Sequence, residues 1–192
     1  MSAAPGQAVA HGAAPAEDGG RTVKTGMLLF IVSEAMLFAA FFAAYFYLRG
    51  ESATWPPTQT IARPELGLVT VNTAILLASS ATLQLAHAGG KAWRRWLAAT
   101  IALGTTFLVL QGIEFSRNAF SIADGVFGGT FYTLTTLHGT HVTVGLLVLA
   151  AMLARARRGF LTHDSGAFAA ASYYWHFVDV VWLILFITVY VL

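Results

Sequence analysis

The chain has 192 residues, of which 57% are hydrophobic and only 10% are charged, whereas an average soluble domain carries about 25% charged residues. Lipid is therefore the expected solvent for most of the chain. The sequence contains no cysteine, which excludes disulfides, thiolate metal sites and iron–sulfur clusters. A formal net charge of +2 is too small, and too scattered along the chain, to indicate nucleic acid as a partner.

Five apolar stretches follow an N-terminal tail, residues 1–22, which is rich in Ala, Gly and Pro and which we expect to be mobile. Each stretch is about as long as the roughly 20 residues that a helix needs to cross a bilayer. They cover residues 26–48, 67–89, 95–115, 129–154 and 168–192. The sequence thus predicts an all-α membrane protein, with one domain of five transmembrane helices over residues 23–192.

The basic residues are shared unevenly between the two sides of such a bundle. Eight Lys and Arg residues fall on the side of the N-terminus and three on the opposite side. The first set comprises Arg21, Lys24, Lys91, Arg94, Arg95, Arg155, Arg157 and Arg158, and the second comprises Arg49, Arg63 and Arg117. Because cytoplasmic connectors carry the excess of Lys and Arg, the sequence predicts a cytoplasmic N-terminus and a C-terminus outside.

In the first span, Glu34 is the ionisable residue that needs an explanation. It follows Lys24 by about ten residues, or roughly 15 Å along a helix, which places it near the middle of the membrane. A charged side chain there costs at least about 2.5–3.5 kcal/mol. We therefore expect a neutral carboxyl or a polar partner, and the neighbouring Ser33 is a candidate for that support.

The later spans carry two pairs of ionisable residues at helical spacing. His138 and His141 share one face of the fourth span, and His176 and Asp179 share one face of the fifth. Together with Glu34 they offer the nitrogen and oxygen donors of a metal site. Hydrogen bonds between helices satisfy the same groups without a metal. The residues alone leave open an accessory or structural role, a membrane metalloenzyme and a proton-coupled carrier.

Gln111 and Glu114 form another pair, three residues apart in the third span. The pair lies near the predicted outer end of that span. We expect water or lipid head groups to satisfy both side chains, in a structural role.

Several motifs, in order along the chain, carry a family resemblance. They are Gly26-Met-Leu-Leu-Phe-Ile-Val-Ser-Glu34, Trp55-Pro56-Pro57, Asn72-Thr-Ala-Ile-Leu-Leu-Ala-Ser79, Gln111-Gly-Ile-Glu114, Asp124-Gly125, His138-Gly-Thr-His141-Val142 and Tyr174-Trp-His-Phe-Val-Asp-Val-Val-Trp182. With these motifs the sequence resembles the haem-copper oxidase subunit III family, the subunit III of cytochrome c and quinol oxidases, in its five-helix bacterial form. It departs from the family pattern at Thr136, Leu137 and Thr140, where the family usually has Gly, Phe and Leu.

The resemblance implies a non-catalytic, multi-pass subunit of a proton-pumping terminal oxidase, located in the bacterial cytoplasmic (inner) membrane. Haem and copper then belong to partner subunits, and this chain has no redox centre or metal of its own. The expected direct partner is oxidase subunit I, with subunit II and other oxidase subunits in the same complex. The subunit would bind phospholipid, stabilise subunit I and support its proton uptake.

The resemblance also implies roles for particular residues. Glu34 matches a buried carboxylate of the family that reacts with carbodiimides, and Arg155 falls where the family has an arginine that binds a lipid head group. The resemblance accounts for the remaining ionisable residues as an intramembrane polar network without a metal. That network comprises His138, His141, His176, Asp179 and Glu114.

Overall fold

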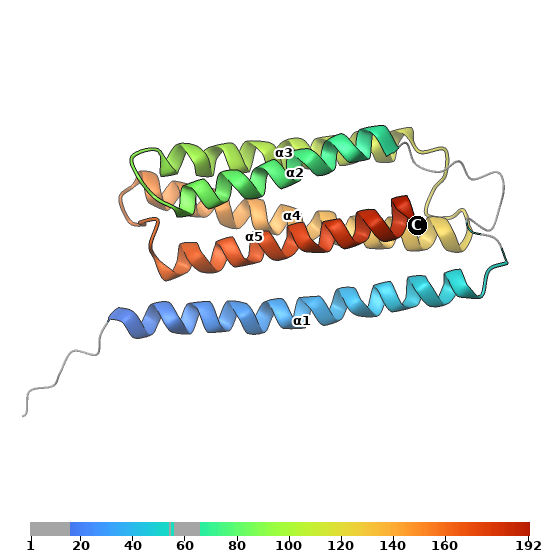
Figure 1. Ribbon diagram of the computed structural model, residues 1–192, viewed down its shortest axis with the longest axis horizontal. Coiled ribbons are helices and arrows are strands. Elements are labelled where there is room, and N and C mark those ends of the chain that lie inside the picture. The colour runs from blue at the N-terminus through green and yellow to red at the C-terminus, as the bar shows by residue number, and fades with distance from the viewer. Residues whose placement is uncertain (1–15, 54, 56–65) are drawn as a thin grey trace, which may run out of the picture.

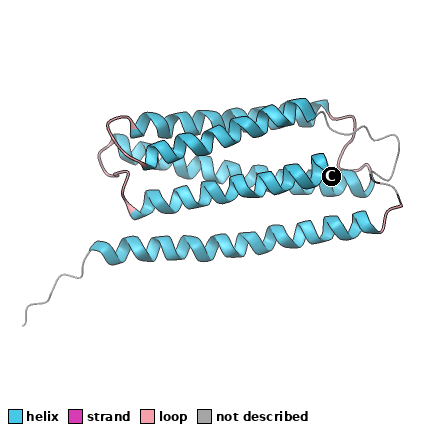
Figure 2. Cartoon of the chain, in the orientation of Figure 1, coloured by secondary structure: helices cyan, strands magenta, loops and turns pink. Residues whose placement is uncertain are grey.

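A computed structural model describes residues 16–53, 55 and 66–192, and these residues form helices and no strand. The helices are α1 (Ala16–Gly50), α2 (Leu66–His87), α3 (Trp93–Arg117), α4 (Gly125–Arg157) and α5 (Gly166–Leu185), and the π-helical turn η1 (Phe186–Val191) continues α5. All five spans are long and apolar enough to cross a membrane. The predicted all-α fold with five spans is confirmed (Figures 1 and 2).

Two helices extend well beyond the predicted apolar stretches. α1 begins at Ala16 instead of 26, so residues 16–22 of the predicted mobile tail are helical, while residues 1–15 lie outside the described part of the chain. α4 likewise begins at Gly125 instead of 129 and ends at Arg157 instead of 154. The physical reason is that hydropathy marks where a helix leaves the lipid, whereas backbone hydrogen bonds can continue into the interface.

Helices α2 to α5 form a bundle, and α1 lies along its outside (Figure 1). α1 packs mainly against α5 and less against α4, and it is the least buried of the five spans. Large apolar side chains project from it into the surroundings, among them Leu29, Met36 and Tyr47. This exposure agrees with the sequence of α1, which places aromatic and aliphatic residues on every face of the helix.

Trp175 lies where α2, α3, α4 and α5 meet. Its indole is fully buried and fits against Gly104 of α3 and Gly145 of α4, where a Cβ atom would come within 2.6 Å and 2.9 Å of the ring. The indole Nε1 donates a hydrogen bond of 3.1 Å to the hydroxyl of Ser79 on α2. A single side chain therefore fixes the approach of all four helices.

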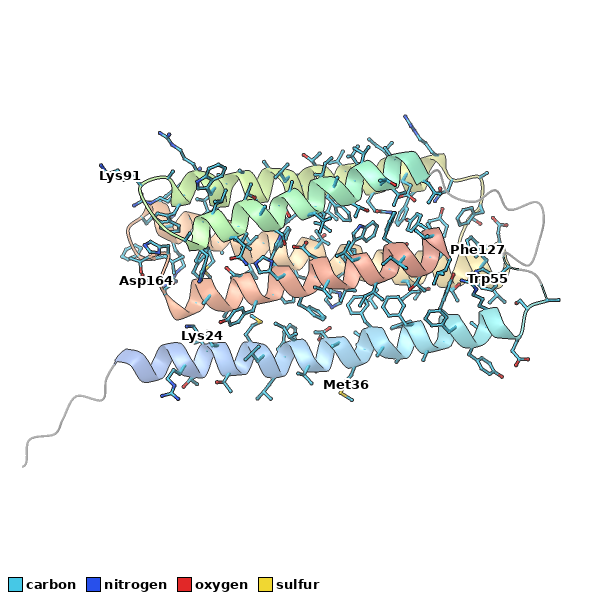
Figure 3. All side chains as sticks on the ribbon, in the orientation of Figure 1. Lys24, Met36, Trp55, Lys91, Phe127 and Asp164 are labelled. Atoms are coloured by element: carbon cyan, nitrogen blue, oxygen red, sulfur yellow. The ribbon has the colours of Figure 1, made fainter. Side chains whose placement is uncertain are left out.

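Two close contacts at glycines show which connectors lie at the same end of the bundle. A Cβ at Gly166, at the start of α5, would lie 2.6 Å from Cα of Gly20 in α1, and the ring of His163 covers Gly89 after α2. Figure 3 shows Lys24 and Lys91 at this end as well, with Trp55 and Phe127 at the opposite end. All eight basic residues assigned to the N-terminal side belong to the segments that meet here; of the opposite set, Arg63 lies outside the described residues.

Candidate functional site: polar groups inside the membrane

Glu34 of α1 is paired with His141 of α4. The Oε2 atom of Glu34 lies 2.8 Å from Nε2 of His141, and the two side chains are 19% and 11% exposed. The ring of Phe38 packs on the imidazole at 4.9 Å, and the hydroxyl of Tyr174 donates to the backbone carbonyl of His141 at 3.2 Å. The pair thus joins the outlying helix α1 to the bundle, halfway along both helices.

The hydrogen-bond partners of His141 determine how many protons the pair holds. Its Nδ1 lies 2.8 Å from the carbonyl oxygen of Leu137, and because a carbonyl only accepts, Nδ1 carries a proton. A contact of 2.8 Å between Nε2 and Glu34 then needs one further proton between the two atoms. Whether that proton rests on nitrogen or on oxygen, the pair has no net charge. This explains how a carboxyl group is tolerated at this depth.

Two expectations about this region are wrong in detail. Ser33 does not support Glu34, because its hydroxyl donates to the carbonyl of Phe30 at 2.7 Å. His138 does not act together with His141, although both belong to one motif. It is buried between the rings of Phe107 and Trp182, at 5.9 and 4.9 Å. Three residues of helix separate the two imidazoles by about 60° of rotation, which is enough for one to face the core and the other to face α1.

A second group of polar side chains joins α2 to α5. Nδ1 of His176 and Oδ2 of Asp179, both on α5, are 4.0 Å apart, which is too far for a direct hydrogen bond. The hydroxyl of Ser80 on α2 bridges them, 2.9 Å from Nδ1 of His176 and donating to Oδ2 of Asp179. Gln84, one turn further along α2, places its Nε2 3.1 Å from Nε2 of His176.

The donors in this second group form a single chain. The Gln84 amide donates to Nε2 of His176, which leaves the ring proton on Nδ1 to be donated to Ser80, and Ser80 in turn donates to the carboxylate of Asp179. The sequence alone did not identify Ser80 as part of this group. Its position one helical turn before Gln84 on the same face was the available signal.

Gln111 and Glu114 are buried inside the protein, contrary to the expectation that water or lipid head groups reach them. They are 4% and 3% exposed, and Nε2 of Gln111 donates to Oε2 of Glu114 at 2.9 Å. The π-helical turn after α5 covers them, because its Tyr190 lies against both side chains. The predicted fifth span, residues 168–192, includes this continuation of α5, but a hydropathy pattern could not show that it packs over Gln111 and Glu114.

The five residues considered for a metal site do not converge. Glu34 and His141 lie between α1 and α4, whereas His176 and Asp179 lie between α2 and α5, and His138 is enclosed by aromatic rings. Within residues 16–53, 55 and 66–192 the structure shows no group of three or more metal-ligating His, Asp or Glu side chains. A metalloenzyme that uses these five residues together has no geometric support.

Arg155 lies in the last turn of α4, at the end of the bundle where the basic residues gather. Its side chain is exposed, and Arg157 and Arg158 follow it in the chain. An arginine at the end of a span can extend to the head-group region while its methylene groups remain along the helix. Its position therefore permits the lipid contact that the sequence predicts.

The comparisons with known proteins agree with this arrangement. The family model for cytochrome c oxidase subunit III matches residues 10–192. A cytochrome c oxidase subunit 3 of Struthio camelus is 42% identical over 179 residues, which cover 88% of this chain and 69% of the relative. Those of Pylaiella littoralis and Salmo salar are 42% and 41% identical, covering 88% and 94% of this chain and 66% and 72% of the relatives. The chain belongs to the cytochrome c oxidase subunit III family and is a multi-pass membrane component of an oxidase complex.

Proposed function

We propose that this chain is an accessory, non-catalytic subunit of a proton-pumping haem-copper terminal oxidase. It binds phospholipid, stabilises subunit I by direct contact and supports the proton uptake of that subunit, with subunit II and other oxidase subunits in the same complex. Haem and copper belong to partner subunits. The placement in a bacterial cytoplasmic membrane, with the N-terminus inside, rests on the resemblance to the five-helix bacterial form and on the excess of Lys and Arg at one end, since the relatives named above are eukaryotic.

One observation carries the accessory role. Three ionisable groups inside the membrane form hydrogen bonds between helices, Glu34 with His141 and Asp179 with Ser80, and the ionisable groups are not gathered around a common point. Side chains arranged in this way hold helices in register. They do not assemble a pocket in which a substrate could react.

Lipid binding is supported at two separate places. A groove of about 300 Å³ between α1 and α4 is lined by Phe41, Ala44 and Leu134 together with small residues of α4. It suits an acyl chain, because its lining is mostly apolar. Arg155 lies roughly 31 Å further along α4 from Leu134, at 1.5 Å per residue. The groove and the arginine therefore serve lipids of opposite leaflets.

The test compares the oxidase with and without this chain, purified through a tag on another subunit. We expect the isolated chain to show no stoichiometric haem or copper spectrum. The complex that lacks it should keep its haem spectrum, take up protons more slowly and become inactive after fewer turnovers, and adding the chain back should restore both properties. A haem or copper spectrum in the isolated chain, or equal uptake and lifetime in the two preparations, would contradict the proposal.

A further inference from the structure

The hydrogen-bonded chain through Ser80 connects a partly exposed imidazole to a buried carboxyl group. The side chain of His176 is 30% exposed, whereas that of Asp179 is 6% exposed. On α2, Ser80 and Gln84 are followed at helical spacing by His87, which is exposed in the last turn of the helix. Polar side chains therefore continue from the level of Ser80 to the end of α2, over roughly 10 Å of helix.

Each ring nitrogen of His176 faces a group that can either donate or accept a hydrogen bond. Nδ1 lies 2.9 Å from the hydroxyl of Ser80, and Nε2 lies 3.1 Å from the side-chain amide of Gln84. A hydroxyl does both, and an amide changes from donor to acceptor when it turns over. His141 differs, because its Nδ1 faces the carbonyl of Leu137, which only accepts. A proton can therefore be relayed through the ring of His176 but not through that of His141.

The carboxyl group at the end of this chain is short of donors. Oδ2 of Asp179 accepts from Ser80, and no donor of the described residues reaches the buried Oδ1. An ionised carboxylate with a single donor is costly away from water. Adding a proton to Asp179 removes that cost, and the chain of hydrogen bonds supplies a route for the proton.

We propose that Asp179 is a proton-holding site, which exchanges one proton with the aqueous side through His176 and Ser80. In the ionised form, Gln84 donates to Nε2 of the ring, Nδ1–H donates to Ser80, and Ser80 donates to Oδ2 of Asp179. An incoming proton binds Nε2, the proton on Nδ1 passes to Ser80, and the hydrogen of Ser80 passes to Oδ2. The Gln84 amide turns over to accept from the new Nε2–H. The imidazole is neutral before and after, and the net change is one proton taken up by the carboxylate.

The other ionisable groups on the elements that pack against α5 do not interrupt this exchange. On α2, His87 interacts electrostatically with His176, and because the ring stays neutral at both ends of the exchange, a charged His87 is tolerated. On α1, α4 and η1 the ionisable groups have contacts of their own: Glu34 with His141, His138 with aromatic rings, and Tyr190 with Glu114. The inference concerns this chain alone, and it is independent of the roles proposed above in lipid binding, stabilisation and proton uptake by subunit I.

Infrared difference spectra of the purified oxidase complex, recorded between two pH values, test whether Asp179 takes up a proton. We expect a band in the protonated-carboxyl region that grows on acidification and is missing in Asp179→Asn, which keeps the shape of the side chain. Ser80→Thr retains a hydroxyl and should retain the band. If acidification produces no band that depends on Asp179, the proposal is wrong.

Transfer of the complex into D₂O tests the route, because the band shifts when O–H becomes O–D. Ser80→Ala and His176→Gln each interrupt the chain of hydrogen bonds. In both variants we expect the shift to be roughly 10–100-fold slower than in the wild type, which corresponds to a barrier raised by about 1.4–2.8 kcal/mol. His141→Gln is the matched control, since the ring that it removes is no relay, and it should exchange at the wild-type rate.

Two results would overturn the route. Exchange at the wild-type rate in Ser80→Ala or in His176→Gln would show that the proton reaches Asp179 in another way. Equal slowing in His141→Gln would show that the variants disturb the bundle generally. Circular dichroism checks the helix content of each variant, and Ser80→Thr, which should exchange like the wild type, separates loss of the hydroxyl from loss of packing at this position.

Discussion

Replacing Gly104 by alanine tests how the indole of Trp175 sets the distance between helices. The added methyl would meet Cη2 of Trp175 at 2.6 Å, Cζ2 at 2.9 Å and a methyl group of Leu146 at 2.9 Å. The two Trp175 atoms belong to a rigid ring that is fully buried and held by the hydrogen bond to Ser79. The strain therefore cannot be relieved by a simple rotation of a flexible chain end.

The magnitude follows from a comparison within one helix. Forcing an extra methyl into a packed core costs about 1–3 kcal/mol, while the change from glycine to alanine gains about 0.5–1 kcal/mol of helix propensity. Gly112→Ala, also in α3, has only the second effect, because no atom lies within 4 Å of its new Cβ. The difference between the two variants should thus equal the packing cost of roughly 1–3 kcal/mol.

The assay is reversible unfolding of the purified chain in mixed detergent micelles, followed by circular dichroism. Trp175→Phe should lower stability by itself, since it removes the indole and its bond to Ser79. Combined with Gly104→Ala, however, it should cost less than the sum of the two changes, because the shorter ring frees space for the methyl. If Gly104→Ala proves as stable as Gly112→Ala, or if the double change is additive, Trp175 does not set the spacing of these helices.

Three further predictions concern the polar groups. Glu34→Ala should destabilise the chain by about 1–3 kcal/mol, because it leaves the imidazole of His141 without a partner. Glu34→Gln can still donate to Nε2 of His141 and should lose much less stability. Thermal unfolding in detergent measures both variants, and equal losses would contradict the pairing. Ser80→Ala should lower stability by a similar amount, about 1–3 kcal/mol, because the Asp179 carboxylate loses the hydroxyl that joins it to the imidazole of His176. Ser80→Thr keeps a hydroxyl and should recover part of that stability; no recovery would contradict the role of the bridge. Arg155→Ala should release a tightly bound phospholipid from the purified complex, as counted by lipid phosphorus, and unchanged lipid content would remove Arg155 from the lipid site.

The number of spans could be predicted because it depends on local properties. A run of apolar residues long enough to cross the bilayer is visible in the sequence, and so is a carboxyl such as Glu34 in its middle. The partner of that carboxyl could not be predicted. His141 is more than a hundred residues away in the chain, and the choice between it, His138 and Ser33 depends on how α1 is rotated against α4.

The sequence by itself determined the solvent of this protein, the five membrane spans and, through seven ordered motifs, the family. Those properties are sums over local composition or matches of residue order, and they need no knowledge of how helices pack. Only the tertiary structure decided that Ser80 joins His176 to Asp179, that Tyr190 covers Gln111, and that Trp175 packs against Gly104 and Gly145. In a membrane every side of an apolar helix is compatible with lipid, so the hydrophobic pattern carries little information about which face meets which neighbour. Packing around Trp175 and hydrogen bonds between distant side chains supply that information.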